Sequence, residues 1–376
     1  MASEKSKKEH IFIPMLLFLF FFLGSFSYSS TPSAEEAKKE KDTEKKFGYI
    51  VLPVLYYTPE TKMAAGVGTL FYFRPSTDPK SRPSDIKTII IYTQRKQFVF
   101  GTSPDFYLKK EKYHLMIDTA FSKFPDKFYG VGSQTAEEME EDYTSQVSQF
   151  NISLQKKVLQ KMYVGLIYAF EHNRIVKKEE GKLLAKKELL GSEGGASSGF
   201  GFLLNWDSRD SVYYPTSGSL HKFSIILFQS ILGSDFEFTE FNLDLRKYVS
   251  FFSRHILALQ AYLNFISGNP PFQMMSLFGG QEMMRGYYQG RYRDKQMMAF
   301  QMEYRLPALW RIGLVGFAGW GDVADKINHF DFSNLKYSLG WGIRFALNRE
   351  ESINLRLDFG YGKRSSGVYF TAGEAF

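Results

Sequence analysis

The chain of 376 residues contains no cysteine and only 6 histidines. The lack of cysteine excludes disulfides, thiolate metal sites and lipid attachment through a processed N-terminal cysteine. The histidines are scattered without the His-Glu-x-x-His spacing of metalloproteases, and no Gly-x-Ser-x-Gly turn accompanies them. These absences predict a protein that is not an enzyme and that holds no cofactor or metal ion.

The sequence beyond residue 26 also lacks long apolar runs and a concentrated charge of one sign. No run reaches the ~18 apolar residues of a membrane-spanning helix, which excludes a bundle of such helices. The formal net charge is +7, but the basic residues are dispersed among glutamates, as in residues 177–187. Nucleic acid is therefore not expected as a partner.

The N-terminus is the one strongly apolar region. Lysines among the first residues precede an apolar run over residues 11–26, and small residues follow it up to Ser30. This order predicts a secretory signal peptide over residues 1–30. A signal anchor is the alternative, although the run is shorter than the ~20 residues of a spanning helix. Residues 31–46 are rich in Lys, Glu and Ala without apolar periodicity, and they predict a disordered linker.

Apolar residues alternate with small or polar ones over residues 337–347 and again over 353–361. Because a strand projects successive side chains to opposite faces, each segment has one apolar and one polar face. The polar faces are rich in Gly, with Arg and Asp among them, which is typical of a lumen rather than of a soluble surface. The pattern predicts an all-β, transmembrane antiparallel β-barrel over residues 47–376.

Counting such segments gives about 16 strands, an even number as in bacterial single-chain barrels. They lie near residues 47–57, 63–74, 85–94, 96–108, 112–122, 143–156, 161–173, 197–206, 218–231, 236–249, 254–266, 296–306, 311–322, 336–347, 353–362 and 367–376. Counts of about twelve or fourteen stay open, since boundaries read from sequence drift by a few residues. With both barrel ends on the periplasmic side, the long connections follow odd-numbered strands and face the cell exterior.

Two segments carry a family resemblance. Residues 278–287 read Phe-Gly-Gly-Gln-Glu-Met-Met-Arg-Gly-Tyr and are followed by Gly-Arg-Tyr-Arg-Asp at 290–294 and Glu-Tyr-Arg at 303–305. This pattern resembles the sixth extracellular loop and following strand of the BamA/TamA outer-membrane assembly and translocation superfamily, also called the bacterial surface antigen family. Residues 207–218 are similar to the family's turn between its eighth and ninth strands. The resemblance covers essentially residues 48–376.

The first segment predicts a contact between loop and lumen. The connection over residues 268–295 is long and glycine-rich, so it can fold back into the barrel, and strand parity turns Glu303 inward. The planar fork of Arg285 suits a carboxylate such as Glu303. The resemblance implies that Arg285, Gly286 and Tyr287 of the loop lock onto the wall at Glu303. In the alternative reading, Arg285 is solvated and Glu303 merely lines a wet lumen.

One departure from the family pattern weakens the expected lock. The family's next strand usually carries an inward Asp in a Phe-x-Asp-x-Gly pattern, and this chain has Gly319 at that position. We therefore expect Arg285 to have one acidic partner fewer, unless Asp322 replaces the missing one.

The turn and the chain end complete the candidate sites. Asp207, Arg209 and Asp210 are expected to cap the turn, Pro215 to stiffen it and Gly218 to supply a positive φ, all in a structural role. Phe376 shares its strand parity with Phe370 and Val368, although Glu374 interrupts the apolar series. This ending resembles the terminal signal by which the barrel assembly machinery recognises such proteins for insertion.

The resemblance implies a protein integral to the bacterial outer membrane. It implies a role in membrane biogenesis or in transport of a polypeptide or lipid client across the lipid bilayer. Members of the family that assemble or export proteins usually carry soluble POTRA domains before the barrel, which residues 31–46 are too short to form. We therefore expect client capture to use a separate periplasmic partner.

The expected mechanism uses the seam between the first and last strands, where Gly66, Gly68, Gly367 and Gly373 weaken pairing. The alternative is a passive channel, or a surface-exposed structural antigen with a plugged lumen. An outer-membrane enzyme is the third and least favoured reading.

Overall fold

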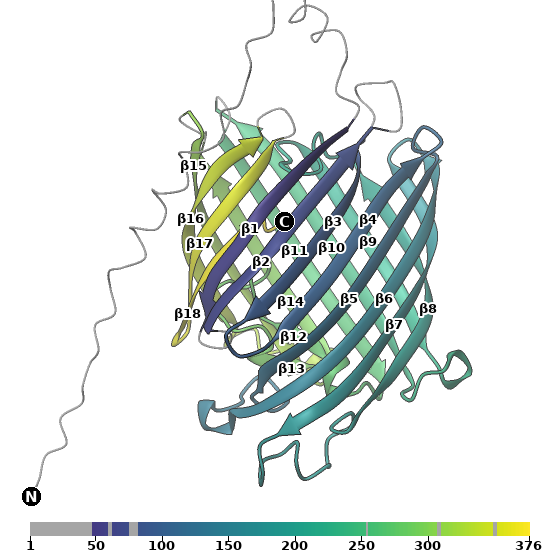
Figure 1. The fold of residues 1–376 in the computed structure, drawn as a ribbon, viewed down its shortest axis with the longest axis vertical. Helices are drawn as coiled ribbons and strands as arrows, with labels where there is room; N and C mark the ends of the chain where they lie inside the picture. Colours follow the sequence, from purple (N-terminus) through teal and green to yellow (C-terminus); the bar gives the residue numbers. More distant parts are fainter. Residues whose placement is uncertain (1–46, 59–61, 75–81, 253–254, 307–309, 349–351) are drawn as a thin grey trace, which may run out of the picture. The chain divides into compact units, whose positions relative to one another are not determined.

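The structure is a computed structural model, and it describes residues 47–376 except 59–61, 75–81, 253–254, 307–309 and 349–351. The predicted signal peptide and linker, residues 1–30 and 31–46, lie outside the described residues. No helix in the described part is long and apolar enough to span a membrane. The described chain contains one antiparallel sheet of 16 strands that curves around an interior (Figure 1).

The strands of the curved sheet match the predicted segments in number and order. They are β1 (Phe47–Thr58), β2 (Lys62–Phe73), β3 (Ser84–Thr93), β4 (Phe98–Leu108), β5 (Tyr113–Phe128), β6 (Glu141–Leu159), β7 (Met162–Lys178), β8 (Gly194–Asp207), β9 (Gly218–Phe228), β10 (Phe238–Phe251), β11 (His255–Gly268), β14 (Gln296–Arg305), β15 (Ile312–Ala324), β16 (Lys336–Asn348), β17 (Ile353–Gly362) and β18 (Ser365–Ala372). The connections contain four short 3₁₀ turns and one small hairpin. These are η1 (Glu137–Met139), η2 (Ser230–Leu232), η3 (Phe272–Met274), η4 (Ile327–His329), β12 (Ser276–Phe278) and β13 (Tyr292–Asp294).

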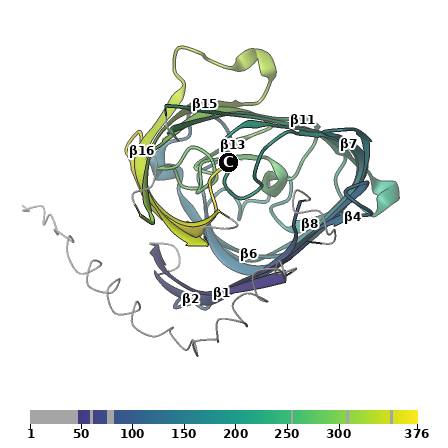
Figure 2. The same cartoon turned by 90° about the horizontal axis from the view of Figure 1, so that it is seen from above.

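Each strand of the sheet pairs with its neighbours in the chain, with one exception. β11 pairs with β14, because β12 and β13 pair with each other inside the connection. Viewed from above, this connection and the chain's C-terminal end lie inside the curve of the sheet (Figure 2). The strand order runs from β1 to β18, and no pairing among the described residues joins these two edges.

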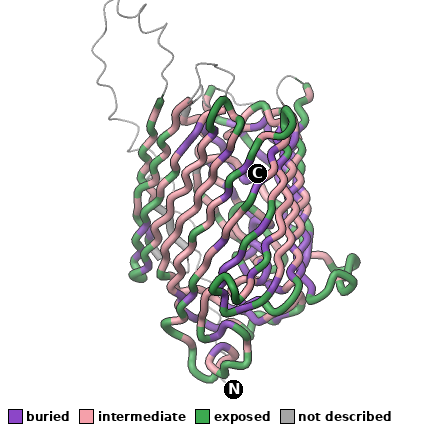
Figure 3. The backbone as a smooth tube through the Cα atoms, turned by 90° about the vertical axis from the view of Figure 1, so that its right-hand side faces the viewer, coloured by how far each residue is buried: buried purple, intermediate pink, exposed green. Residues whose placement is uncertain are grey.

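More buried and more exposed residues alternate along the strands (Figure 3). On β14, Met302 and Tyr304 are exposed outside the barrel, whereas Glu303 and Arg305 are fully buried inside it. The predicted assignment of apolar residues to the outside and charged residues to the inside is therefore confirmed here. The all-β barrel class and the count of about 16 strands are confirmed as well.

Several strands are longer than their sequence pattern indicated, β5, β6 and β7 among them. β5 ends at Phe128 rather than near residue 122, and β7 ends at Lys178 rather than near residue 173. β6 begins at Glu141 rather than near residue 143. The added stretches are polar, as at Lys123 and Lys177. Apolar alternation marks only the part of a strand that contacts lipid, while the hydrogen-bonded ladder continues past it.

The chain end differs from the prediction. β18 ends at Ala372 rather than continuing to Phe376, because Gly373 takes a φ of +88° and turns the chain. Phe376 is 4% exposed and packs inside the barrel against Tyr248 of β10 and Ala258 of β11. The prediction that Phe376 continues the lipid-facing series of β18 is wrong in this structure.

Candidate functional site

The connection between β11 and β14, residues 269–295, folds into the interior, and we call it the inner loop. Its apolar residues pack against the barrel wall rather than facing water. Phe278, Met284 and Tyr287 form a buried cluster with Met297 of β14 and Val323 of β15. This packing gives the loop a defined position within the interior.

Glycines allow the inner loop to press against β17. Gly286 has a φ of +110°, and a Cβ there would lie 2.7 Å from backbone atoms of Tyr361 and Gly362. The Gly286 N–H donates to Tyr369 Oη at 2.9 Å, and Tyr287 Oη accepts from the Lys363 N–H at 2.9 Å. Gly286 and Tyr287 of the predicted lock therefore fix the loop backbone to the last two strands.

Arg285 lies at the centre of the site and is only 1% exposed. Its Nη2 lies 2.6 Å from Glu303 Oε1, and its Nη1 lies 2.5 Å from Asp358 Oδ2. The guanidinium carbon lies 3.6 Å from the ring centroid of Phe317, a cation–π geometry. The predicted contact between Arg285 and Glu303 is present, and the reading in which Arg285 is solvated is wrong.

The two carboxylates continue into a larger network. Glu303 Oε2 lies 2.9 Å from Arg305 Nη2, and Asp358 Oδ1 lies 2.5 Å from Arg344 Nη1. Arg344 also reaches the chain end, where its Nε lies 2.7 Å from Glu374 Oε2. We call this set the ion cluster. Its members are Arg285, Glu303, Arg305, Arg344, Arg356, Asp358 and Glu374.

Burial makes each member of the ion cluster depend on the others. A charge taken out of water costs several kcal/mol unless partners compensate it. The cluster draws on the inner loop, on β14, β16 and β17 and on the chain end, so it ties these parts together. It also contains backbone contacts to the chain end, since Arg305 Nη2 donates to Phe376 O at 2.8 Å.

The expectation of a missing acidic partner is wrong. Asp358 of β17 supplies the second carboxylate for Arg285. Asp322 does not replace it, because its carboxylate binds Lys336 Nζ at 2.5 Å and Ser133 Oγ at 2.8 Å. At Gly319, an added Cβ would lie 3.0 Å from Met284 Sδ, so this inward position accommodates the inner loop instead of an acid.

The sequence predicted that Asp358 faces the lumen, but it did not predict the contact of Asp358 with Arg285. Arg344, Arg356 and Asp358 all have the inward parity of their strands, and all three are buried. Nothing in the local pattern shows that a loop before β14 crosses the interior to β17. The three residues were therefore predicted to line the lumen but not to meet Arg285.

Side-chain hydrogen bonds of Asp207 and Asp210 lie within the turn between β8 and β9. Asp210 Oδ1 accepts from the N–H groups of Thr216 and Ser217 at 2.9 and 3.1 Å. Burial alone would raise the pKa of the Asp210 carboxyl, but these bonds and one from Thr216 Oγ1 outweigh it and lower that pKa. Asp207 Oδ2 lies 2.9 Å from Arg209 Nη2 and 2.5 Å from Arg82 Nη1. The Pro215 carbonyl lies 3.5 Å from Nη1 of Arg305, next to the ion cluster.

Gly218→Ala tests this turn. Gly218 has a φ of +95°, and a Cβ there would lie 2.2 Å from Ser208 O, so the substitution should cost more than about 1 kcal/mol of stability. Gly316→Ala is the matched control, because nothing lies within 4 Å of a Cβ at that position. Thermal unfolding followed by heat-dependent gel mobility measures both. Equal midpoints for the two variants would contradict the role given to Gly218.

No group of three or more His, Asp or Glu residues in the described ranges is placed to hold a metal ion. The ion cluster instead combines Arg with carboxylates, and the contacts of Asp358 with Arg285 and Arg344 are charge-assisted hydrogen bonds. These ion pairs join the inner loop to strands of the wall.

Solved structures share this architecture. BamA from Haemophilus ducreyi lacking POTRA domains 1–3 is similar with a TM-score of 0.55 and 15% identity, over 87% of this chain and 69% of that one. CdiB from Acinetobacter baumannii gives a TM-score of 0.55 and 11% identity, over 87% of this chain and 59% of that one. CdiB from Escherichia coli gives 0.53 and 9%, over 87% and 62%. This chain thus spans about three fifths of the CdiB chains, and at these identities the likeness concerns the fold alone.

A comparison with curated protein sequences finds no significant match. The family model of the Omp85 superfamily domain matches residues 92–376, which include β4 to β18, the inner loop and the whole ion cluster. That match covers well over half of the chain. The protein therefore belongs to the Omp85 superfamily of outer-membrane β-barrels.

Proposed function

We propose that this Omp85 barrel acts in membrane biogenesis or in transport of a polypeptide or lipid client, without enzymatic chemistry. The observation that carries the proposal is the edge of β1. β1 pairs with β2 along its whole length and with no other described strand. Its second row of backbone N–H and C=O groups faces the gap toward β18.

An unpaired strand edge has a large driving force to find a partner. In hydrocarbon, each unsatisfied backbone group costs several kcal/mol. An exposed edge also accepts an additional strand through main-chain hydrogen bonds, independently of the partner's sequence. Pro53 lies within β1, and proline is tolerated in edge strands because it lacks an N–H donor. The β1 edge is thus suited to transient pairing with an extended polypeptide.

The interior offers a client less room than the seam. The inner loop packs against β14 and β15, and the ion cluster fastens it to β17. This arrangement favours a route along the wall between β1 and β18 over a route through the centre. We propose that a separate periplasmic partner presents the client.

Cross-linking the seam between β1 and β18 tests the proposal. The chain has no cysteine, so only the introduced cysteines react with the cross-linker. Val51→Cys on β1 and Val368→Cys on β18, both exposed outside the barrel, are joined by a flexible bismaleimide. The control joins Val51→Cys to Thr69→Cys, its paired residue on β2. Depletion of the native protein should change the protein and lipid composition of the outer membrane. In depleted cells that express the variants, the same change should persist with the seam cross-link and disappear with the control cross-link. Normal composition with a fully cross-linked seam would contradict the proposal.

The second candidate is a passive channel or structural antigen with a plugged lumen, and the filled interior is the observation that favours it. Conductance in planar bilayers separates the two candidates. A channel should conduct steadily with an intact seam and be insensitive to the seam cross-link. A client-handling barrel should conduct little in the absence of client.

A further inference from the structure

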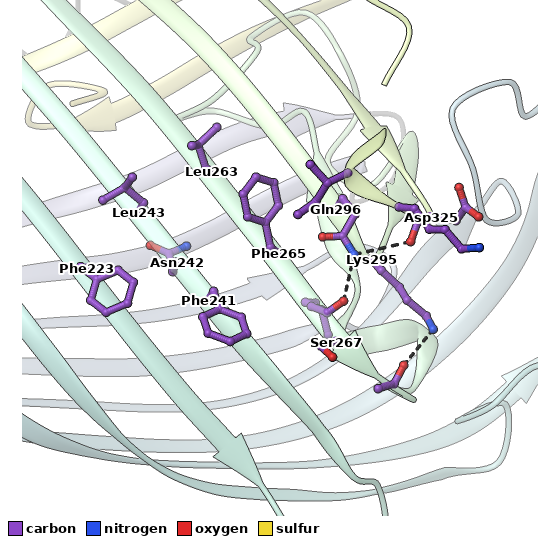
Figure 4. A pocket seen from close by; sticks show the side chains of 14 residues that line it. Phe223, Phe241, Asn242, Leu243, Leu263, Phe265, Ser267, Lys295, Gln296 and Asp325 are labelled. Carbon is purple, nitrogen blue, oxygen red and sulfur yellow. Dashed lines mark hydrogen bonds between the residues drawn. The ribbon is translucent and has the colours of Figure 1, made fainter. Parts of the chain in front are cut away.

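An apolar groove of about 700 Å³ lies on the outside of the wall, beside the last residue of the inner loop and away from the seam. Its floor is formed by Phe223 of β9, Phe241 and Leu243 of β10, and Leu263 and Phe265 of β11 (Figure 4). These residues have the parity opposite to the interior residues of the same strands, such as Asp244 and Tyr248. The groove therefore opens toward lipid.

The groove is closed at one end by the connection between β15 and β16, residues 325–335. This connection projects outward from the wall (Figure 2) rather than covering the interior. Asp325, Lys326 and Ile327 of the connection line the groove. A flat lipid-facing wall is thereby converted into a recess with a polar rim.

Hydrogen bonds hold this rim in place. Gln296 Nε2 donates to Ile266 O at 2.9 Å and to Asp325 O at 3.5 Å, which ties the start of the connection to β11 and β14 (Figure 4). Lys295 Nζ donates to Gly268 O at 2.8 Å. The recess is therefore preformed and does not depend on a ligand to assemble it.

Polarity changes along the groove in the direction of the strands. Lys295, Lys326 and Asp325 lie at the loop end, and the aromatic floor begins at Phe265 and continues past Leu263. From Gly268 to Leu263 the strand advances roughly 17 Å, at about 3.4 Å per residue. That span is comparable to one leaflet of a hydrocarbon core about 30 Å thick. The charged end thus lies at headgroup level and the rings at acyl-chain level.

The charges at the rim favour an anion. Asp325 is engaged by His329, with Nδ1 2.7 Å from Oδ1. Lys326 is exposed and forms no ion pair with any residue of the described ranges. Lys295 uses one of its three N–H donors on Gly268 O and keeps two for a ligand.

We propose that this groove binds one phosphorylated lipid of the leaflet that faces the long connections. One acyl chain lies along Phe241, Phe265 and Leu263, and the phosphate meets Lys326 and Lys295. Aromatic side chains provide large apolar contact area, and lysines at membrane interfaces attract anionic headgroups. The site is separate from the seam, so it anchors or orients the barrel in the membrane rather than handling the client.

Native mass spectrometry of the detergent-purified, full-length barrel tests this assignment. The probes are dioleoyl phosphatidic acid and dioleoyl phosphatidylcholine, which share acyl chains and differ in net headgroup charge. Wild type should retain one molecule of phosphatidic acid in preference to phosphatidylcholine. Lys326→Ala should weaken retention of phosphatidic acid about fivefold, since one lysine near an anionic headgroup contributes about that factor.

Two leucine variants separate the groove from general lipid contact. Leu263→Trp fills the groove and should abolish retention. Leu166→Trp places the same side chain on the outside of β7, where Leu166 is exposed outside the groove, and should leave retention unchanged. Excess inorganic phosphate should not displace the lipid, because the acyl chain supplies most of the contact. Equal retention of both lipids by wild type, unchanged retention by Lys326→Ala or Leu263→Trp, or displacement by phosphate would overturn the proposal.

Discussion

Glu303→Gln should destabilise the barrel by about 3–5 kcal/mol, the cost of breaking a buried ion pair. Glu303 is fully buried, forms an ion pair with Arg285 and accepts a hydrogen bond from Arg305. Glutamine keeps the volume but removes the charge, so Arg305 loses its carboxylate partner and Arg285 keeps only Asp358. Unfolding in urea, followed by tryptophan fluorescence in detergent, measures the loss.

A double-mutant cycle with Arg285→Ala identifies the origin of this loss. If the two groups stabilise each other, the double variant should be clearly more stable than the sum of the single changes predicts. The pair formed by Lys127 and Glu140, both partly exposed, is the matched control. An exposed pair of this kind couples by only about 0–1 kcal/mol. Strict additivity for Arg285 and Glu303 would mean that their contact does not hold the loop.

Phe376→Ala should lower stability by about 3 kcal/mol, because the ring is buried inside the barrel and its removal leaves a cavity. The side chain packs against Tyr248 and Ala258, and its carbonyl accepts from Arg305. The same variant should reduce the amount of barrel in the outer membrane, since a loosened end fails to close the fold. Urea unfolding and quantitative membrane fractionation measure the two effects.

Phe370→Ala is the matched control for the chain end. Phe370 lies on β18 and is 44% exposed toward lipid, so its truncation should cost much less stability than that of Phe376. If Phe376 instead continues the lipid-facing series, the two variants should behave alike. A larger effect at Phe370 than at Phe376 would contradict the inward position of the chain end.

Much of the wall is predictable from the sequence, because a strand between lipid and a polar lumen alternates apolar with polar or small residues. Strand β17 shows this clearly: Leu355, Leu357 and Phe359 alternate with Arg356 and Asp358, and the structure has a strand with that parity. The same rule stops where the wall leaves the bilayer. It therefore missed the polar ends of β5 to β7, where only backbone hydrogen bonds continue the sheet.

The interior is less predictable, because its contacts join residues far apart in the chain. Arg285 and Glu303 were paired through a family resemblance and strand parity, both of which are local to one loop and the next strand. Asp358 is separated from Arg285 by 73 positions and by three strands of the 16-stranded sheet. The turn at Gly373 was missed because one glycine in an alternating segment is compatible with a continued strand.

The central claim is that the inner loop is held inside the barrel by the ion cluster. Amide hydrogen exchange at Met284 and Gly286 tests it most directly, since their N–H groups donate to Gln301 Oε1 and Tyr369 Oη, each at 2.9 Å. We predict that both amides exchange far more slowly in wild type than amides of the outward connection 325–335, and that Glu303→Gln removes this protection. Exchange in wild type as fast as in that connection would contradict the claim.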